Sequence, residues 1–186
     1  MTPRLAATVI LAMALAVPAR AQVLQDRKDD EVFKDVAQTV LGYPQFTIFD
    51  DVSAAITDGV VTLQGKVTMP FKSKDIERRV TKVPGVKRVE NRIGVLPVSL
   101  FDDELRYSVA RAIYGSSAFW QYASMVNPPI HIIVERGRVT LTGVVASEVE
   151  RMLARALASS FNAFSVTSDL KTDQEMKALL DRKGVG

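Results

Sequence analysis

Apolar residues recur along the chain with two alternating periodicities. Residues 32–40 place valine at every fourth position, which is the spacing of one helix face. Residues 52–56 and 61–67 alternate apolar and polar side chains, the period-two pattern of half-buried strands. Helical spacing returns over 76–83, and alternation returns over 89–95. The pattern predicts the order helix, strand, strand, helix, strand.

The same succession occurs a second time. The segment "DDEVFKDVAQTVLG" at 29–42 is matched 73 residues later by "DDELRYSVARAIYG", and "GVVTLQG" at 59–65 is matched 78 residues later by "GRVTLTG". Downstream, "VENRI" at 89–93 is matched by "VTSDL" at 166–170. Three matching blocks in one order indicate a duplicated unit. The second copy gains five residues, within an expanded loop at 116–129, and Val149, Leu153 and Leu157 mark the expected apolar stripe of its second helix.

Glycines punctuate both copies at equivalent places. Asp58-Gly59 is a strong hairpin signal because such a turn needs positive φ, which glycine adopts at little cost, and Gly137 occupies the same place in the second copy. Gly65 and Gly143 fall on the face of the hairpin strand that is expected to be buried. Either a helix packed closely over the sheet or a β-bulge would explain them.

These patterns predict an α+β fold with two tandem αββαβ modules, each a small three-stranded mixed sheet with two helices on one face. The apolar Val98, Leu100 and Phe101 between the modules predict that the two copies pack against each other. Thr172 and Glu175 form the capping box of a short helix in the tail. The expected divisions are a leader at 1–21, an N-terminal segment at 22–28, module one at 29–96, a linker at 97–101, module two at 102–171 and a tail at 172–186.

The first 21 residues have the pattern of a secretory signal peptide. Arg4 precedes an apolar stretch of 13 residues, Leu5 to Val17, and Ala19-Arg20-Ala21 is a small-x-small cleavage site. A spanning helix needs roughly 20 apolar residues, which argues against a membrane anchor. Removing Arg4 and Arg20 leaves 22 basic against 21 acidic residues, so the net charge falls from +3 to +1. We therefore expect export to the periplasm, or secretion, and the alkaline full chain is no evidence for a nucleic-acid partner.

Two segments of the first copy resemble BON domains. "DGVVTLQGKV" at 58–67 and "VPGVKRVENRI" at 83–93, with Pro84 and Gly85 in the turn, are similar to the hairpin and closing strand of that family. The second copy keeps "RGRVTLTGVV" at 136–145 but replaces Pro-Gly-Val by Asn-Ala-Phe at 162–164, which puts its last strand in doubt. The resemblance covers 29–171 and is closest to the tandem, hyperosmotically inducible periplasmic type. It implies attachment to phospholipid surfaces in osmotic or envelope stress.

No residue pattern supports an enzyme. His131 is the single histidine, it alternates with apolar strand residues, and we expect it to face solvent on the far side of the sheet. The chain has no cysteine, no phosphate loop, no nucleophile elbow and no zinc spacing. Acidic runs at 29–31 and 102–104 begin predicted helices, where negative charge is favourable, so capping explains them better than metal binding. We predict no catalytic residue, no metal and no cofactor. RNA binding is disfavoured by export and by the absence of a GXXG loop.

Two features are candidates for binding. Residues 66–92 carry nine basic and three acidic side chains, whereas 22–65 carry three basic and eight acidic ones. The expanded loop holds the single tryptophan, Trp120, and aromatic side chains with a polar handle favour membrane interfaces. A solvated helix face and a loop folded back into the core are the alternative interpretations. The hypothesis is contact with an anionic phospholipid surface through Lys72, Lys74, Arg78, Arg79, Lys82 and Trp120.

A protein-interaction adaptor or chaperone-like module for other envelope proteins is the alternative function. Exposed sheet faces and edges could serve such a role. The sequence leaves open the partner, the oligomeric state and the relative orientation of the modules.

Overall fold

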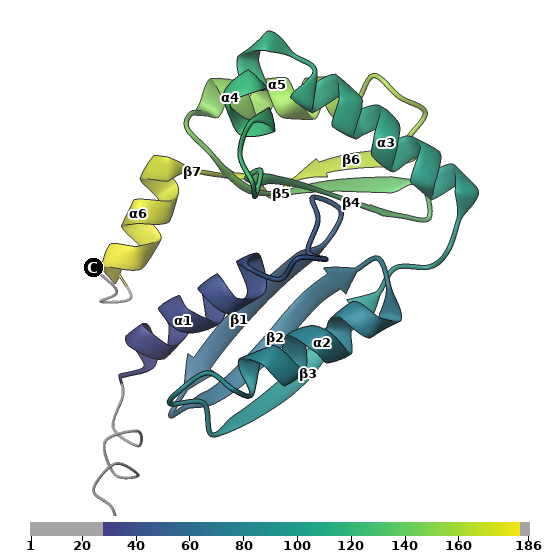
Figure 1. Cartoon of the computed structure of the whole chain (residues 1–186). Helices are drawn as coiled ribbons and strands as arrows, with labels where there is room; N and C mark the ends of the chain where they lie inside the picture. The colour runs from purple at the N-terminus through teal and green to yellow at the C-terminus, as the bar shows by residue number, and fades with distance from the viewer. Residues whose placement is uncertain (1–27, 183–186) are drawn as a thin grey trace, which may run out of the picture.

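The computed structural model describes residues 28–182, so the predicted leader lies outside the described part of the chain (Figure 1). Module one contains α1 (Asp29–Leu41), β1 (Asp51–Thr57), β2 (Val60–Val67), α2 (Pro70–Val80) and β3 (Arg88–Val95). Module two contains α3 (Leu100–Tyr114), η1 (Ser117–Phe119), α4 (Trp120–Ala123), β4 (Ile130–Glu135), β5 (Arg138–Val145), α5 (Glu148–Ala158), β6 (Ser165–Ser168) and β7 (Lys171–Thr172). The tail forms α6 (Asp173–Arg182).

Both modules have the predicted mixed sheet. β1 pairs antiparallel with β2, and β2 pairs parallel with β3. In module two, β4 pairs antiparallel with β5, and the closing strand is divided into β6 and β7, both parallel to β5. The division falls at Asp169 and Leu170, and Leu170 is buried at the place where module one has Ile93. The closing strand that the sequence left in doubt is therefore present, in two pieces.

The two long helices of each module, α1 and α2 in one and α3 and α5 in the other, cover one face of its sheet, and the cores lie between these layers (Figure 1). Leu63 and Leu141, which are equivalent in the repeated phrase, are both fully buried. The predicted stripe of α5 is wrong at Val149, which is exposed. Ala154 and Ala158 face the core instead, at the places of Ile76 and Val80 in α2. Because alanine is smaller than isoleucine or valine, less side-chain volume separates α5 from its sheet than separates α2 from its sheet.

A repeated aspartate ties each first helix to its hairpin turn. Asp58 and Gly59 have φ of 52° and 76°, and Arg136 and Gly137 have φ of 53° and 73°. The Asp29 carboxylate accepts hydrogen bonds from the amides of Asp58 and Gly59 at 2.8 and 3.0 Å. The Asp102 carboxylate accepts the equivalent pair at 2.8 and 2.7 Å. Successive amides in such a turn form an anion-binding concavity. The acidic runs therefore do more than begin helices, because their first carboxylate holds the turn.

The glycines on the buried strand face are required by the partner strand. A Cβ on Gly65, whose φ is 127°, would lie 2.0 Å from the carbonyl oxygen of Asp51. A Cβ on Gly143, whose φ is 113°, would lie 1.9 Å from the carbonyl oxygen of Pro129. The expectation that a closely packed helix explains these glycines is wrong, since the close neighbour is the backbone at the start of the adjacent hairpin strand.

The turn before β3 is also next to a hairpin. Gly85 has φ of 92°, the amide of Val86 bonds to the carbonyl of Val83, and the amide of Lys87 bonds to the carbonyl of Gly59. The Pro84-Gly85 turn thereby sets the start of β3 against the β1–β2 turn.

The modules pack against each other as predicted, but not through the linker. Val98 is 94% exposed and Leu100 84% exposed, so the linker side chains do not make the contact. The loop before β1 makes it instead. Ile48 and Phe49 pack against the core of module two, and the Phe49 ring meets Tyr107 edge-on at 5.3 Å.

The tail helix begins with the predicted capping box. The Thr172 hydroxyl accepts a hydrogen bond from the Glu175 amide at 3.2 Å, and the Glu175 carboxylate accepts one from the Thr172 amide at 2.9 Å. Arg151 of α5 donates to the same carboxylate, which fastens α6 to module two.

Candidate functional site

Three of the predicted lipid-contact residues lie in one stripe on the outer face of α2 and the turn after it. Lys74, Arg78 and Lys82 follow Phe71 at intervals of three, four and four residues, and all four side chains are exposed. Helical spacing puts side chains three and four apart on one face. The stripe therefore has an aromatic side chain at its N-terminal end and three cations after it, of which Arg78 pairs with Asp75 at 2.5 Å.

Arg79 lies beside the stripe at a groove between α1 and the end of α2. Its guanidinium stands 4.8 Å from the centre of the Tyr43 ring, a cation–π geometry that holds the side chain in place. The groove has a volume of about 430 Å³, and its polar lining consists of Arg79, Lys82, Gln38, Thr39 and the acidic Asp35. Two cations and two neutral hydrogen-bonding side chains can bind a small anionic group such as a phosphate at the Arg79–Lys82 side of the groove, away from the carboxylate of Asp35.

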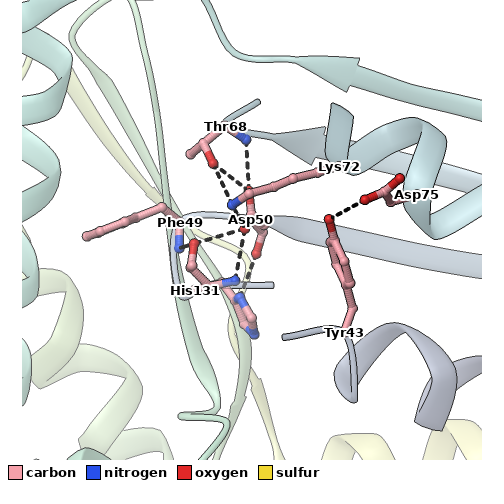
Figure 2. Close-up of polar contacts among 8 residues, drawn as sticks. Tyr43, Phe49, Asp50, Thr68, Lys72, Asp75 and His131 are labelled. Carbon is pink, nitrogen blue, oxygen red and sulfur yellow. Dashed lines mark hydrogen bonds and ion pairs between the residues drawn. The ribbon is translucent and has the colours of Figure 1, made fainter. Parts of the chain in front are cut away.

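Lys72 does not belong to this surface, and its prediction as a lipid contact is wrong. Lys72 is 5% exposed, and its ammonium lies 2.6 Å from the carboxylate of the fully buried Asp50 (Figure 2). It also donates to the Thr68 hydroxyl at 2.8 Å. The sequence contained the signal for this burial, because Lys72 stands four residues before Ile76 on the apolar stripe of α2.

Asp50 is the centre of a polar cluster that joins the loop before β1 to the start of α2. Its carboxylate accepts hydrogen bonds from the amide and hydroxyl of Thr47, from the amide and hydroxyl of Thr68, and from Lys72. Burial by itself raises the pKa of Asp50, but the hydrogen bonds from Lys72, Thr68 and Thr47 outweigh it and hold the pKa below its ordinary value. The cluster therefore keeps an ionised carboxylate in the interior.

Asp50 also contacts the second module, through its backbone carbonyl. The carbonyl oxygen of Asp50 lies 2.6 Å from Nδ1 of His131 on β4 (Figure 2). The centre of the His131 ring lies 5.5 Å from that of the Phe46 ring. The expectation that His131 faces solvent is wrong, because module one covers that face of β4. Ile133, on the same face, is buried as well.

In module one the backbone amide of Thr68 donates to Asp50, and in module two the equivalent amide has a different acceptor. The amide of Ala146, which corresponds to Thr68, donates to the carboxylate of Glu150 at 2.9 Å, and the hydroxyl of Tyr122 donates to the same carboxylate at 2.7 Å. Burial and the neighbouring Glu150 raise the pKa of Tyr122. Glu150 occupies the place of Lys72. The carboxylate that accepts this amide therefore belongs to the loop before β1 in module one, as Asp50, and to helix α5 in module two, as Glu150.

Three backbone groups on the outer edge of β4 have partners outside the sheet. The hydroxyl of Tyr114 donates to the carbonyl of Ile130 at 2.5 Å, and the guanidinium of Arg106 donates to the carbonyl of Val134 at 2.6 Å. Between them, the amide of Ile132 donates to the carbonyl of Ile48 at 2.7 Å. Module one thus places the turn at residues 47–50 on the edge of the second sheet, a contact that the sequence pattern did not reveal.

The expanded loop divides its aromatic residues between core and surface. Phe119 is fully buried and Tyr122 packs beside it, whereas Trp120 is 65% exposed. Trp120 lies on α4 of module two, and Figure 1 shows α4 at the opposite end of the view from α2. The structure therefore does not bring Trp120 and the basic stripe into one patch.

Four exposed apolar side chains lie in the linker or close to it, and they are called the linker patch. The patch consists of Val98, Leu100, Phe101 and Phe164, with the two phenylalanine ring centres 6.3 Å apart. Phe164 is 79% exposed and stands in the segment that replaces the Pro-Gly-Val turn. Exposed apolar side chains that gather at one place are typical of an interaction site.

Residues 28–182 contain neither a cluster of metal ligands nor a membrane-spanning helix. No three acidic or histidine side chains in that range gather closely enough to hold a metal ion. No helix of the described part is both long and apolar enough to cross a bilayer.

Comparison with known proteins places both modules in one family. No curated protein matches the chain. Two solved structures of CdsD, a structural protein of the type III secretion system of Chlamydia trachomatis, show distant similarity. The C-terminal domain of CdsD is 11% identical, with a TM-score of 0.32, over 77% of this chain and 66% of that one. A second CdsD structure is 13% identical, with a TM-score of 0.27, over 79% of this chain and 97% of that one. TM-scores this low carry no argument about fold or function.

The family comparison is decisive by contrast. The model of the BON domain matches residues 29–97 and again residues 121–172. These two segments cover the repeated hairpins, the helices α1, α2 and α5, and the closing strands of both modules. Because together they span more than half of the chain, the protein belongs to the BON-domain family and carries two BON units in tandem.

Proposed function

We propose that this protein is a non-enzymatic periplasmic protein that attaches weakly and reversibly to anionic phospholipid surfaces through α2. The observation that carries the proposal is the exposed stripe of Phe71, Lys74, Arg78 and Lys82 beside the groove that holds Arg79. Cations of this kind are attracted to anionic headgroups, and the groove offers a place for one phosphate. Phe71 supplies an apolar side chain that can enter the interface at the end of the stripe.

The expected affinity is low. Each basic side chain near an anionic surface contributes about 1 kcal/mol, so the four exposed cations Lys74, Arg78, Arg79 and Lys82 contribute about 4 kcal/mol, which corresponds to a Kd of about 1 mM. Lys72 is excluded from this sum because its ammonium is paired with Asp50 inside the module. Trp120 would add to binding only in an orientation that presents module two.

Vesicle sedimentation across a salt series tests the proposal. Anionic vesicles should retain the protein at low salt and release it as salt rises, whereas neutral vesicles should retain little, because screening weakens charge attraction. The variant K74Q/R78Q/R79Q/K82Q should lose the salt-dependent binding. The matched control R111Q/R136Q/R138Q/R155Q removes the same charge from exposed arginines of module two and should keep it. Equal loss in both variants, or salt-independent binding, would eliminate the α2 surface.

Single substitutions separate the apolar contributions. F71A should weaken binding to anionic vesicles at high salt, where the charges are screened, and W120A should leave it unchanged if α2 is the contact surface. The opposite result would move the contact to α4.

The linker patch favours a second candidate function, an adaptor for other envelope proteins. Val98, Leu100, Phe101 and Phe164 expose apolar surface that neither module covers. A pull-down from envelope extract with and without detergent, using the wild type and L100D/F164S, tests it. A partner that survives detergent and is lost in the variant supports the adaptor, whereas material that disappears with detergent supports lipid attachment.

A further inference from the structure

The contact between the two modules is not symmetric. Module one contributes mainly residues 46–50, and module two contributes the outer edge of β4, the face of β4 that its own helices leave uncovered, and Tyr107 of α3. An ion pair between Lys66 of β2 and Glu135 of β4 adds to the contact. Because the modules are copies of one unit, each of them carries both halves of such a contact. The chain therefore has one edge and one segment left over, β1 of module one and residues 124–128 of module two.

The outer edge of β1 is the uncovered counterpart of β4. β1 is the terminal strand of its sheet, and no segment within residues 28–182 pairs with its outer side. Val52, Ala54 and Ile56 are only half-buried, whereas their counterparts Ile130, Ile132 and Val134 are completely buried. The backbone groups of these counterparts bond to Tyr114, Ile48 and Arg106. Exposed strand edges are templates for pairing with another chain.

Residues 124–128 are the unused counterpart of 46–50. Val126 stands 78 residues after Ile48, the same interval that separates β1 from β4 and Leu63 from Leu141. Ile48 is packed against module two, but Val126 is 97% exposed. Val126 and Ile48 line one hollow of about 200 Å³ together with Pro128 and His131, so the unused segment is continuous with the existing interface.

We propose that a second copy of this chain occupies the free edge, with residues 124–128 of one molecule lying against β1 of the next. The contact would repeat the one inside the chain. The amide of Ala54, in the place of Ile132, would donate to the carbonyl of Val126. The hydroxyl of Ser53, in the place of the His131 ring, would donate to the carbonyl of Pro128. Both side chains, Ser53 and Val126, are exposed and free to take part.

Such a contact joins different surfaces of the two molecules, head to tail. Heterologous contacts close into rings or continue as filaments, depending on the rotation between copies. The intermolecular contact is weaker than the intramolecular one, because Ser124, Val126 and Asn127 replace Phe46, Ile48 and Phe49 and offer less apolar area. The assembly should therefore depend on concentration. It does not rest on lipid attachment, although an array of copies would raise the avidity of a weak surface contact.

Disulfide trapping tests the head-to-tail contact directly, because the chain has no cysteine of its own. S53C and V126C would be made as separate variants of residues 22–186 and mixed under mild oxidation without lipid. The mixture should form a covalent heterodimer about tenfold faster than the matched mixture of V126C with T81C, whose cysteine lies at the exposed end of α2, because docking raises the effective concentration of the two thiols. The double variant S53C/V126C should form a ladder of oligomers or a single ring.

Mass measurement without cross-links gives the second readout. The molar mass of the wild type from light scattering should rise with concentration, and V126E should abolish the rise while its circular dichroism spectrum stays unchanged. Cross-linking no faster than in the control mixture, or a wild type that stays monomeric at the highest concentration, would overturn the proposal and leave β1 to another occupant. A V126C homodimer that forms faster than the heterodimer would overturn it too, since it requires a symmetric contact.

Discussion

The ammonium of Lys72 lies 2.6 Å from the carboxylate of Asp50, and neither side chain has appreciable contact with solvent. Asp50 belongs to the loop that carries the module contact, and Lys72 belongs to the first turn of α2. The ion pair therefore couples the interior of module one to the position of the loop that module two packs on.

Removing either partner of this pair should destabilise the protein strongly. K72A leaves a buried carboxylate with one cation fewer, and D50A leaves a buried ammonium, so each should lower the free energy of unfolding by about 3–5 kcal/mol. The exposed neighbour K74A should change it by less than about 0.5 kcal/mol. Urea unfolding followed by circular dichroism measures all three. Similar small effects for K72A and K74A would contradict the buried pair.

The depressed pKa of Asp50 predicts acid sensitivity. A carboxyl group whose pKa is lower in the folded state stabilises the fold above its unfolded pKa of 3.8, and that contribution is lost as pH falls below this value through the folded pKa. The free energy of unfolding of the wild type should therefore decline below about pH 4. That of D50N, which lacks this carboxyl group, should decline less over the same pH range. Urea midpoints measured from pH 6 to pH 2 test this, and parallel curves would contradict it.

The aspartates that hold the hairpin turns should matter unequally. Each accepts two backbone hydrogen bonds, but Asp102 is buried whereas Asp29 is partly exposed. Because hydrogen bonds to charged groups contribute about 1.5–3 kcal/mol and an unsatisfied buried amide is costly, D102A should lose about 3 kcal/mol and D29A about 1.5 kcal/mol. D30A, one residue along the same acidic run, serves as the control and should lose little. Thermal unfolding ranks the three, and an equal loss for D30A would indicate helix-dipole stabilisation instead.

Alanine should be poorly tolerated at two of the three strand glycines. G65A and G143A would each place a Cβ within 2.0 Å of a backbone oxygen at positive φ, so each should cost about 3 kcal/mol or more. At Gly94 the added methyl would meet the flexible side chain of Lys66 at 3.2 Å, and G94A should be mild. Expression level and denaturant midpoint distinguish them. A stable G65A would show that the start of β1 can move aside.

The repeated phrase was enough to predict both hairpins, because alternation and a two-residue turn are local properties. The helices followed from spacing, except that Val149 misplaced the face of α5 by one residue. In contrast, the module contact depends on Ile48 and Ile132, which are far apart in sequence and carry no shared pattern. Lys72 was assigned to the surface because it lies in a basic run, although its place on the Ile76 stripe indicated burial. Side-chain type alone does not say which cation of a run is paired inside.

The opposite placement of charge in the two modules has an evolutionary consequence. A chimera that carried α5 in place of α2 would set the carboxylate of Glu150 beside that of Asp50, and the reverse exchange would point the Lys72 ammonium at the amide of Ala146. Each duplicate has thus become committed to its own helix. Recombination between the two halves of the gene would then produce proteins that misfold. Selection against such proteins would preserve the order of the repeats.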